Sequence, residues 1–333
     1  MTTGAAEDLV TLAEVLDAHR RIQPFVVRTP LVSLTDANPG SELLLKAESL
    51  QPSGAFKLRG AFNSLLQLTG DEQERGVVAH SSGNHAVAVA HAGAVLGIRT
   101  VIVMPHDAPT SKLERTRRLG AELVLVGSGS NERVARADEL VAHHGLCLVE
   151  PYNSTAVVAA TGTISVEIVE DHPDGPGGVA EIYVPVSGGG LAAGVAAAAK
   201  QLDPDIRLIG VEPEVAADAR ASWEAGRIVE LPAEQMARTA ADGLRVQKVG
   251  SLTWPHLQAF VDEIVTVSES EISSAMRSVA TGARLVAEPS GATPIAAALV
   301  GRGGTGAPLR RRVAVLTGGN VDLAVLAEVL AGE

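Results

Sequence analysis

The stretch Glu181–Leu202 reads EIYVPVSGGGLAAGVAAAAKQL, and it divides into an apolar run, a glycine-rich turn and an alanine-rich run. The apolar run predicts a buried strand, and the alanine-rich run predicts the helix that follows it. Glycines let consecutive N–H groups of the turn point at one spot, where the helix N-terminus adds partial positive charge. A turn that binds nothing is the less favoured interpretation, because three successive glycines cost much conformational entropy. We therefore expect a phosphate-binding turn at the carboxyl end of a strand.

The same alternation of short apolar strands and longer helical patterns extends in both directions from this stretch. Strands are expected at Leu43–Glu48, Val77–Ser81, Thr100–Met104, Ala121–Val126, Leu146–Val149, Glu181–Val186, Arg207–Val211, Glu263–Val267 and Arg312–Leu316. Helices are expected between them, at Ser111–Leu119, Glu132–His143, Leu191–Leu202 and Glu271–Leu285. This alternation is typical of α/β proteins with parallel sheets. So many strands in one chain favour two open, mostly parallel sheets flanked by helices.

Composition and charge exclude several classes of protein. The 333 residues carry a net charge of −12, and aromatic residues make up only 2%. Nucleic-acid binders hold phosphates with clustered Lys and Arg or stack bases on aromatic rings, so we expect no nucleic-acid partner. The apolar runs fall short of the roughly 18–20 residues that cross a bilayer, so we expect no membrane partner. A single cysteine, Cys147, and an N-terminus without a signal-peptide pattern favour a cytoplasmic location.

A polar motif follows a second strand. SSGNHA, residues 81–86, comes directly after the strand VVAH and combines hydroxyl, amide and imidazole groups with a predicted helix start. Such a cluster holds a carboxylate through charge-assisted hydrogen bonds. A plain helix N-cap at Ser81 or Ser82 is an equally weighted alternative.

The motif SGAFKLRGA, residues 53–61, places Lys57 between two apolar neighbours, Phe56 and Leu58. Apolar surroundings disfavour the charged ammonium, lower its pKa and leave a nucleophilic amine. Most lysines are solvated surface charges, so Lys57 becomes a candidate nucleophile only together with the phosphate-binding turn. An amine nucleophile and a phosphate cradle together suggest pyridoxal phosphate, an aldehyde that carries a phosphate group.

A nicotinamide cofactor is the rival interpretation of the glycine turn. Gly188, Gly190 and Gly194 loosely resemble the GxGxxG pattern of dinucleotide-binding folds. Glu212 ends the next strand about 20 residues later, where an acid that binds ribose belongs. These residues alone leave both cofactors open.

Ten motifs in register bear on this choice. They are RTPLVSL, LLLKAESLQPSGAFKLRGA, SSGNHA, VIVMPHDAPTSKLE, GAELVLVG, VPVSGGGLAAG, GVEP, ADGL, AEPSGA and TGGNVDL. In this order they closely resemble the fold type II pyridoxal-phosphate enzymes, and within these the serine/threonine dehydratase and serine racemase branch. The resemblance implies open twisted sheets like those of the tryptophan synthase β-subunit. It also implies pyridoxal 5'-phosphate as the cofactor, with its phosphate in the glycine turn.

The resemblance gives a role to each matching position. Lys57 is similar to the lysine that links covalently to the cofactor, and Phe56 would pack beside the cofactor ring. Asn84 resembles the asparagine that hydrogen-bonds the 3-oxygen of the ring, and Thr317 stands where the family has Ser at the ring nitrogen. The remaining matches are Ser187, Gly188, Gly189, Gly190 and Leu191 around the phosphate, and Ser81 and His85 at the substrate carboxylate.

The activity that the resemblance implies is that of an ammonia-lyase. A Thr317 hydroxyl is a poor acid and leaves the ring nitrogen unprotonated, which favours prompt loss of a β-substituent. L-threonine or L-serine would lose water after Lys57 removes the Cα proton, and would give a 2-oxo acid and ammonia. Ser82 matches the second acid/base of racemase-like members, so a serine or hydroxyaspartate racemase is the alternative. A non-catalytic protein that binds an amino acid or the cofactor is a third interpretation, disfavoured because Lys57 and the whole turn are retained.

A divalent-cation site is a further expectation from the resemblance. Glu212, the carbonyl of Ala216 and Asp218 match the spacing of such a site in racemase-like members. Oxygen ligands suit Mg²⁺ or Ca²⁺, and ordinary surface acids are the alternative. Tyr152 stands where threonine dehydratases often have Phe and where serine racemase has Asn, which favours the dehydratase.

The family layout also predicts domains and assembly. Residues 1–49 and 151–333 would form a large domain that binds the cofactor, and residues 50–150 a small inserted domain. We expect no C-terminal regulatory domain after the motif TGGNVDL. The family is mostly dimeric, so a homodimer is expected.

Overall fold

The computed structural model describes residues 9–35, 42–108, 110–127, 129–175 and 177–332. Six strands form the larger sheet: β1 Leu31–Thr35, β2 Glu42–Ala47, β7 Glu181–Pro185, β8 Arg207–Pro213, β9 Glu263–Val267 and β10 Arg312–Leu316. Their order across the sheet is β1-β2-β10-β7-β8-β9. β1 runs antiparallel to β2, and the other neighbours are parallel.

Four strands form the smaller sheet: β3 Val77–His80, β4 Thr100–Pro105, β5 Glu122–Val126 and β6 Cys147–Leu148. They lie in the order β5-β4-β3-β6, and all pairs are parallel. Parallel neighbours need crossover connections, which helices supply. The two mostly parallel sheets confirm the predicted fold class.

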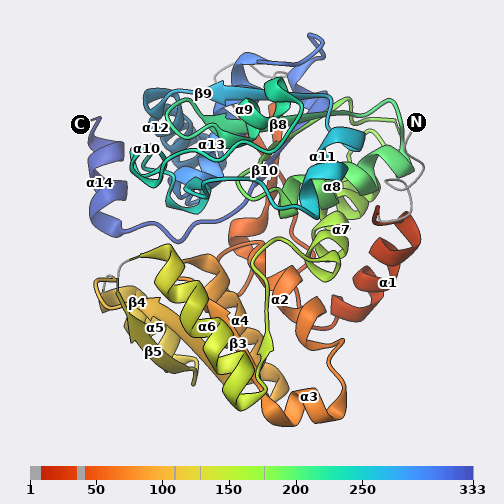
Figure 1. Cartoon of the computed structure of the whole chain (residues 1–333). Coiled ribbons are helices and arrows are strands. Elements are labelled where there is room, and N and C mark those ends of the chain that lie inside the picture. The colour runs from red at the N-terminus through yellow and green to blue at the C-terminus, as the bar shows by residue number, and fades with distance from the viewer. Residues whose placement is uncertain (1–8, 36–41, 109, 128, 176, 333) are drawn as a thin grey trace.

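Fourteen α-helices flank the sheets in the described part of the chain. They are α1 Leu12–Ile22, α2 Lys57–Leu65, α3 Gly70–Arg75, α4 Asn84–Leu96, α5 Thr110–Arg118, α6 Ser130–His144, α7 Thr155–Asp171, α8 Gly190–Leu202, α9 Asp218–Ala225, α10 Ala233–Met236, α11 Thr253–Phe260, α12 Glu269–Ser278, α13 Pro289–Val300 and α14 Leu323–Ala331. Short turns are η1 Glu48–Leu50, η2 Asp242–Leu244, η3 Val279–Ala283 and η4 Leu309–Arg311. In Figure 1 the larger sheet and its helices occupy the upper half, and β3, β4 and β5 lie with α4, α5 and α6 in the lower half.

Each face of the larger sheet has its own hydrophobic core. Alternate side chains of a strand point to opposite faces. Accordingly, Val313 and Val315 of β10 pack with α7, α8 and α11, whereas Ala314 and Leu316 pack with α12 and α13. Burial on both faces explains why these strands read as continuous apolar runs.

The helices α7 and α8 pack unusually closely because glycines face each other. A Cβ on Gly194 would lie 2.1 Å from the Thr161 hydroxyl, and a Cβ on Gly162 would lie 3.0 Å from the Gly194 carbonyl. No side chain larger than hydrogen fits at these contacts. The close packing fixes the start of α8, which follows the glycine turn.

Each predicted strand and helix corresponds to an observed element in the described part of the chain. Each of the nine predicted strands matches an observed strand within two residues at either end. The strand β1 was not predicted. The helix predicted at Glu271–Leu285 was too long, because α12 ends at Ser278 and the wider turn η3 follows it.

The order of the strands along the chain is that expected for a small domain inserted into a larger one. The smaller sheet is built from residues 77–148, between the β2 and β7 strands of the larger sheet. The exact boundaries at residues 50 and 150 stay a prediction. Among the described helices, none combines the length and apolar character needed to span a membrane.

Candidate active site

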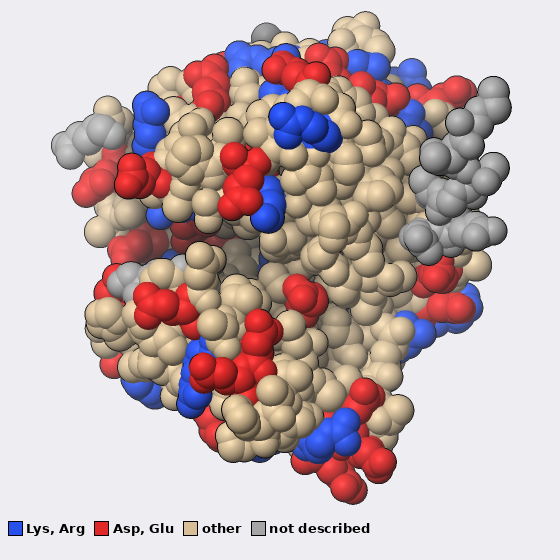
Figure 2. Space-filling model, viewed as in Figure 1, with Lys and Arg blue, Asp and Glu red and all other residues tan. Residues whose placement is uncertain are grey.

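The carboxyl ends of three parallel strands lead into the predicted motifs. β3 runs into residues 81–84, β7 into residues 187–190 and β10 into residues 317–320. The segment before α2 lies against the last of these, since Phe56 N–H donates to the Thr317 carbonyl at 2.9 Å and Ala55 pairs with Gly318. Ligands of open α/β sheets bind at such strand ends. Figure 2 shows the surface hollowed between the two halves of the molecule.

Lys57 is the first residue of α2, and its amine is partly desolvated. Nζ donates to the Pro151 carbonyl at 2.6 Å and lies 5.1 Å from the centre of the Phe56 ring. Burial lowers the pKa of Lys57 to about 8. Much more of this amine is therefore neutral near physiological pH than at an exposed lysine, as a nucleophile or a base requires.

The glycine turn adopts a conformation that depends on its small residues. Ser187 has φ +54° and Gly189 has φ +90°, both in the left-handed region. A Cβ on Gly188 would lie 2.6 Å from carbons of the Tyr152 ring, and one on Gly190 would lie 2.7 Å from the Tyr152 carbonyl. Side chains would thus close the space over the turn. Tyr152 covers the turn from one side.

The N–H groups at the start of α8 form the anion-binding part of the turn. Gly190 and Leu191 open this helix, so their N–H groups have no partner within it. The N–H of Gly189 instead donates to the Val186 carbonyl at 3.0 Å and stabilises the turn itself. The helix N-terminus attracts a phosphate without any basic side chain.

Two threonines outside the predicted set hold this turn in place. The Thr253 hydroxyl donates to the Gly188 carbonyl at 2.7 Å, and the Thr161 hydroxyl donates to the Gly190 carbonyl at 2.9 Å. Both threonines are buried. Sequence reasoning missed them because neither belongs to a strand-terminal motif, and contact with the turn depends on how α7 and α11 pack.

The motif SSGNHA spans the turn after β3, residues 81–83, and the first turn of α4, which begins at Asn84. The Ser81 hydroxyl accepts a hydrogen bond from the Gly83 N–H at 3.1 Å, and Ser82 is half-buried in the same turn. His85 is buried, and its Nε2 lies 2.9 Å from the Val149 carbonyl. Burial, with a smaller effect of Lys57, lowers the pKa of His85 to about 3. His85 is therefore a neutral hydrogen-bonding group rather than a cation at the substrate site.

Asn84, the first residue of α4, is held from two sides. Its Nδ2 donates to Glu288 Oε1 at 2.6 Å, and its Oδ1 accepts from Asn320 Nδ2 at 2.8 Å. Glu288 is 5% exposed, and burial, with a smaller effect of Asp242, raises its pKa to about 7. The motifs AEPSGA and TGGNVDL contain Glu288 and Asn320, but no role was predicted for either residue.

Thr317 directly follows β10 and is 3% exposed. Its carbonyl binds the Phe56 N–H, so its side chain belongs to the strand ends around Lys57. The predicted cofactor residues fit pyridoxal phosphate. They combine a desolvated amine, a turn whose glycines leave no room for a Cβ and a side-chain amide at the start of α4.

The predicted cation residues lie at the end of β8 and the start of α9. Glu212 is 1% exposed and accepts hydrogen bonds from the Ala219 and Arg220 N–H groups. Both carboxylate oxygens of Asp218 are buried without a hydrogen-bond partner among the described residues. Ala216 is buried in the turn between them. Buried orphan carboxylate oxygens beside a second acid suit a hard cation such as Mg²⁺ or Ca²⁺.

Comparisons with known proteins identify the family of the chain. Residues 22–318 match the family model "Pyridoxal-phosphate dependent enzyme". A serine racemase of Oryza sativa subsp. indica is 40% identical over 332 residues, 98% of this chain and 95% of the relative. An L-threonine ammonia-lyase of Thermotoga maritima is 39% identical over 324 residues, 97% of this chain and 78% of the relative. The structure of maize serine racemase matches with a TM-score of 0.88 at 37% identity over 97% of both chains. The chain therefore belongs to the family of pyridoxal-phosphate-dependent enzymes.

Proposed function

We propose that this chain is an ammonia-lyase that eliminates water from L-threonine or L-serine. The observation that carries the proposal is the position of Lys57 relative to the glycine turn. The Pro151 carbonyl holds the Lys57 amine, and the ring of the next residue, Tyr152, covers Gly188. Because consecutive Cα atoms are only about 3.8 Å apart, the amine and the turn flank one short segment.

The side chains of this chain supply the proton transfer. Bound pyridoxal phosphate would draw electrons from the substrate Cα and make its proton acidic. Lys57 Nζ is placed to take that proton, and its pKa of about 8 suits a base near neutral pH. The substrate carboxylate would bind at the N-terminus of α4, beside Ser81, where the helix dipole favours an anion.

Loss of the Cα proton is coupled to departure of the β-hydroxyl. In the overall balance the β-hydroxyl takes up one proton and leaves as water, the Cα proton taken by Lys57 replaces the proton so consumed, and the remaining enamine is released. Hydrolysis of that enamine gives ammonia with pyruvate from serine, or with 2-oxobutanoate from threonine. These are the products to measure.

The test uses purified protein supplied with pyridoxal phosphate. We expect equal amounts of 2-oxo acid and ammonia from L-threonine or L-serine, and none from Lys57→Ala. Lys248→Ala is the matched control, because Lys248 forms an exposed ion pair with Glu230. Absence of 2-oxo acid from both substrates with the parent protein contradicts the proposal.

Serine racemisation is the second candidate function. Racemisation needs an acid/base on each side of the substrate plane. Lys57 would supply one, and Ser82, half-buried between β3 and α4, is the candidate for the other. The buried pair Glu212 and Asp218 supports the same candidate. Chiral analysis of serine decides it, because Ser82→Ala should lose D-serine formation and keep pyruvate formation.

Assembly and domain division belong to the same proposal. We propose a homodimer, supported by exposed apolar side chains of α14, where Leu323 is 80% exposed and Leu330 is 47% exposed. Light scattering should give twice the 34.2 kDa of one chain. We also propose that residues 50–150 form a domain of their own, supported by the smaller sheet that they contain.

A further inference from the structure

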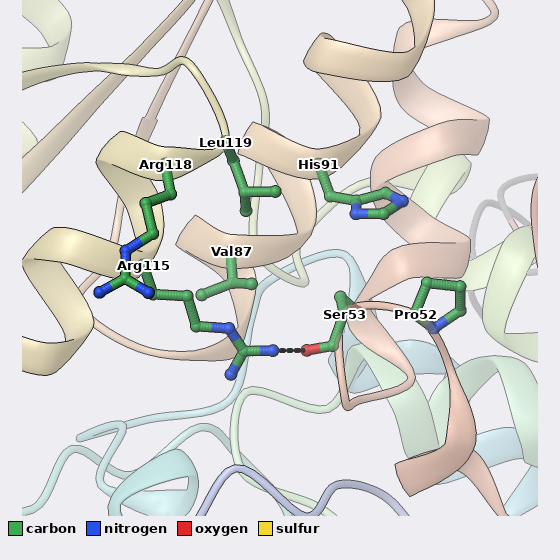
Figure 3. Close-up of a pocket in the computed structure, with 7 residues that line it drawn as sticks. All are labelled: Pro52, Ser53, Val87, His91, Arg115, Arg118 and Leu119. Carbon is green, nitrogen blue, oxygen red and sulfur yellow. Dashed lines mark hydrogen bonds between the residues drawn. The ribbon is translucent and has the colours of Figure 1, made fainter.

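Arg115 of α5 reaches two segments of the candidate active site. Its Nη2 donates to the Ser53 carbonyl at 2.9 Å, and its Nη1 donates to Asn320 Oδ1 at 2.6 Å. Figure 3 shows the bond to Ser53 beside a cavity of about 160 Å³, with Arg118 of the same helix also in the wall. The three bonded residues are far apart in the sequence, so no motif indicates this contact.

The neighbours of Asn320 force one orientation of its side-chain amide. A guanidinium only donates hydrogen bonds, and a backbone carbonyl only accepts them. Oδ1 must therefore face Arg115, and Nδ2 must face the Ser53 carbonyl, which it binds at 3.0 Å. A flipped amide would set donor against donor and acceptor against acceptor at both contacts.

Asn320 passes this orientation on to Asn84. The second hydrogen of Asn320 Nδ2 goes to Asn84 Oδ1, at 2.8 Å. The Asn84 amide nitrogen must then face Glu288, whose carboxylate accepts one of its two hydrogens at 2.6 Å. One hydrogen of Asn84 Nδ2 remains for a ligand. The amide therefore presents a donor rather than an acceptor.

We propose that Arg115 is a positioning residue that, through Asn320, makes Asn84 present its Nδ2 donor to the cofactor. The inference rests on the proposed function and on the contact between Asn84 and the 3-oxygen of pyridoxal phosphate that the family resemblance implies. That oxygen carries negative charge when ionised, and it accepts hydrogen bonds. A donor stabilises the ionised form, whereas an amide oxygen in the same place would repel it.

A purely structural role for Arg115 makes different predictions. The bond to Ser53 alone would attach α5 to the segment before α2, and its loss would lower thermal stability without changing the chemistry at Asn84. The orientation relay instead predicts altered cofactor binding and an altered ionisation of the cofactor. The two roles therefore differ in readouts other than activity.

The test compares holoenzyme of the parent with Arg115→Ala, Asn320→Ala, the double variant and Arg115→Lys. Equilibrium dialysis measures affinity for pyridoxal phosphate, and visible absorption against pH measures the midpoint of cofactor ionisation. Arg118→Ala is the matched control, because Arg118 pairs only with the exposed Glu114 among the described residues. Asn84→Ala tests the contact on which the relay depends.

We expect Arg115→Ala and Asn320→Ala each to weaken cofactor binding about tenfold or more, as disruption of a hydrogen bond to a charged group does. Each should also raise the pH midpoint of cofactor ionisation. The double variant should lose no more than either single variant, because both act through one contact. Arg115→Lys keeps one donor toward Asn320 and should recover part of the parent midpoint, and it covers the case in which Arg115→Ala does not fold.

Two results overturn the relay. One is a parent-like midpoint and affinity in Arg115→Ala with only a lower Tm. The other is a loss in the double variant that equals the product of the two single losses. If Asn84→Ala moves both readouts and Arg115→Ala moves neither, only the relay fails. If Asn84→Ala moves neither, the proposed contact of Asn84 fails, and the relay fails with it.

Discussion

The buried acids Glu212 and Asp218 predict that stability depends on a divalent cation above neutral pH. Burial raises the pKa of Asp218 from 3.8 to about 7, and burial followed by the Asp218 charge raises the pKa of Glu212. The folded protein thus keeps protons that the unfolded chain releases above about pH 4, and stability falls as pH rises from about 4 to 7. A shift of about three pKa units corresponds to a loss of up to about 4 kcal/mol at pH 8.

A bound cation favours the ionised carboxylates and so offsets this loss. Thermal unfolding of chelator-treated protein, with and without Mg²⁺ or Ca²⁺, measures the effect at pH 5.5 and pH 8. The cation should raise Tm by several degrees at pH 8 and hardly at all at pH 5.5, where protons occupy the site. Asp218→Asn should raise Tm at pH 8 without cation and abolish the response, whereas the exposed neighbour Glu214→Gln should keep it. Equal cation effects at both pH values, or a parent-like response of Asp218→Asn, would refute the reasoning.

Three further predictions concern the cofactor site and its support. Glu48→Gln should lower the free energy of unfolding, measured by denaturant titration, by about 3–5 kcal/mol, because it weakens the pairing of the buried Arg59. The control Glu122→Gln changes an exposed ion pair and should lower the same free energy by less than about 1 kcal/mol. Gly188→Ala should abolish cofactor absorption, because its Cβ would lie 2.6 Å from carbons of the adjacent tyrosine ring, and normal absorption would contradict this. The rate at which apoprotein combines with pyridoxal phosphate should rise with pH and level off above about 8, as Lys57 loses its proton; a rate independent of pH between 6 and 9 contradicts the lowered pKa.

The strands were predictable because the fold buries them on both faces. β7, β8 and β10 are buried throughout or nearly so, and each therefore contains a run of four apolar residues after a charged first residue. β1 escaped prediction because it lies at the edge of the larger sheet and mixes half-buried, buried and exposed positions in LVSLT. The motif RTPLVSL was recognised as part of the family pattern, yet its pairing with β2 depends on a neighbour that the local sequence does not reveal.

The candidate site was predictable only where its groups are local in the chain. The glycine turn, Lys57 and Asn84 each sit in a short motif at a strand end or helix start, and such motifs show their chemistry in a few letters. The groups that orient them come from elsewhere: Thr253 binds the turn across 65 residues, and Glu288 binds Asn84 across 204. These residues can be read in the sequence, but their contacts depend on how distant helices pack.

A cluster of four buried charges supports the helix that carries Lys57, and its contacts between distant residues were likewise not predictable from local motifs. Arg59 pairs with Glu48 and with Glu167, each at 2.7 Å, and Lys46 pairs with Glu167 at 2.6 Å, all at exposures of 2% or less. Two cations and two anions cancel, so the cluster avoids the cost of an unpaired buried charge. Well-packed apolar residues could stabilise the fold equally well, because desolvation offsets most of the attraction in buried ion pairs. Apolar packing is not directional, whereas the planar guanidinium of Arg59, bound by carboxylates on two sides, fixes the rotation of α2. Because Arg59 is two residues from Lys57 on that helix, the same ion pairs fix the direction in which the Lys57 side chain leaves α2, and the Pro151 carbonyl then binds its amine.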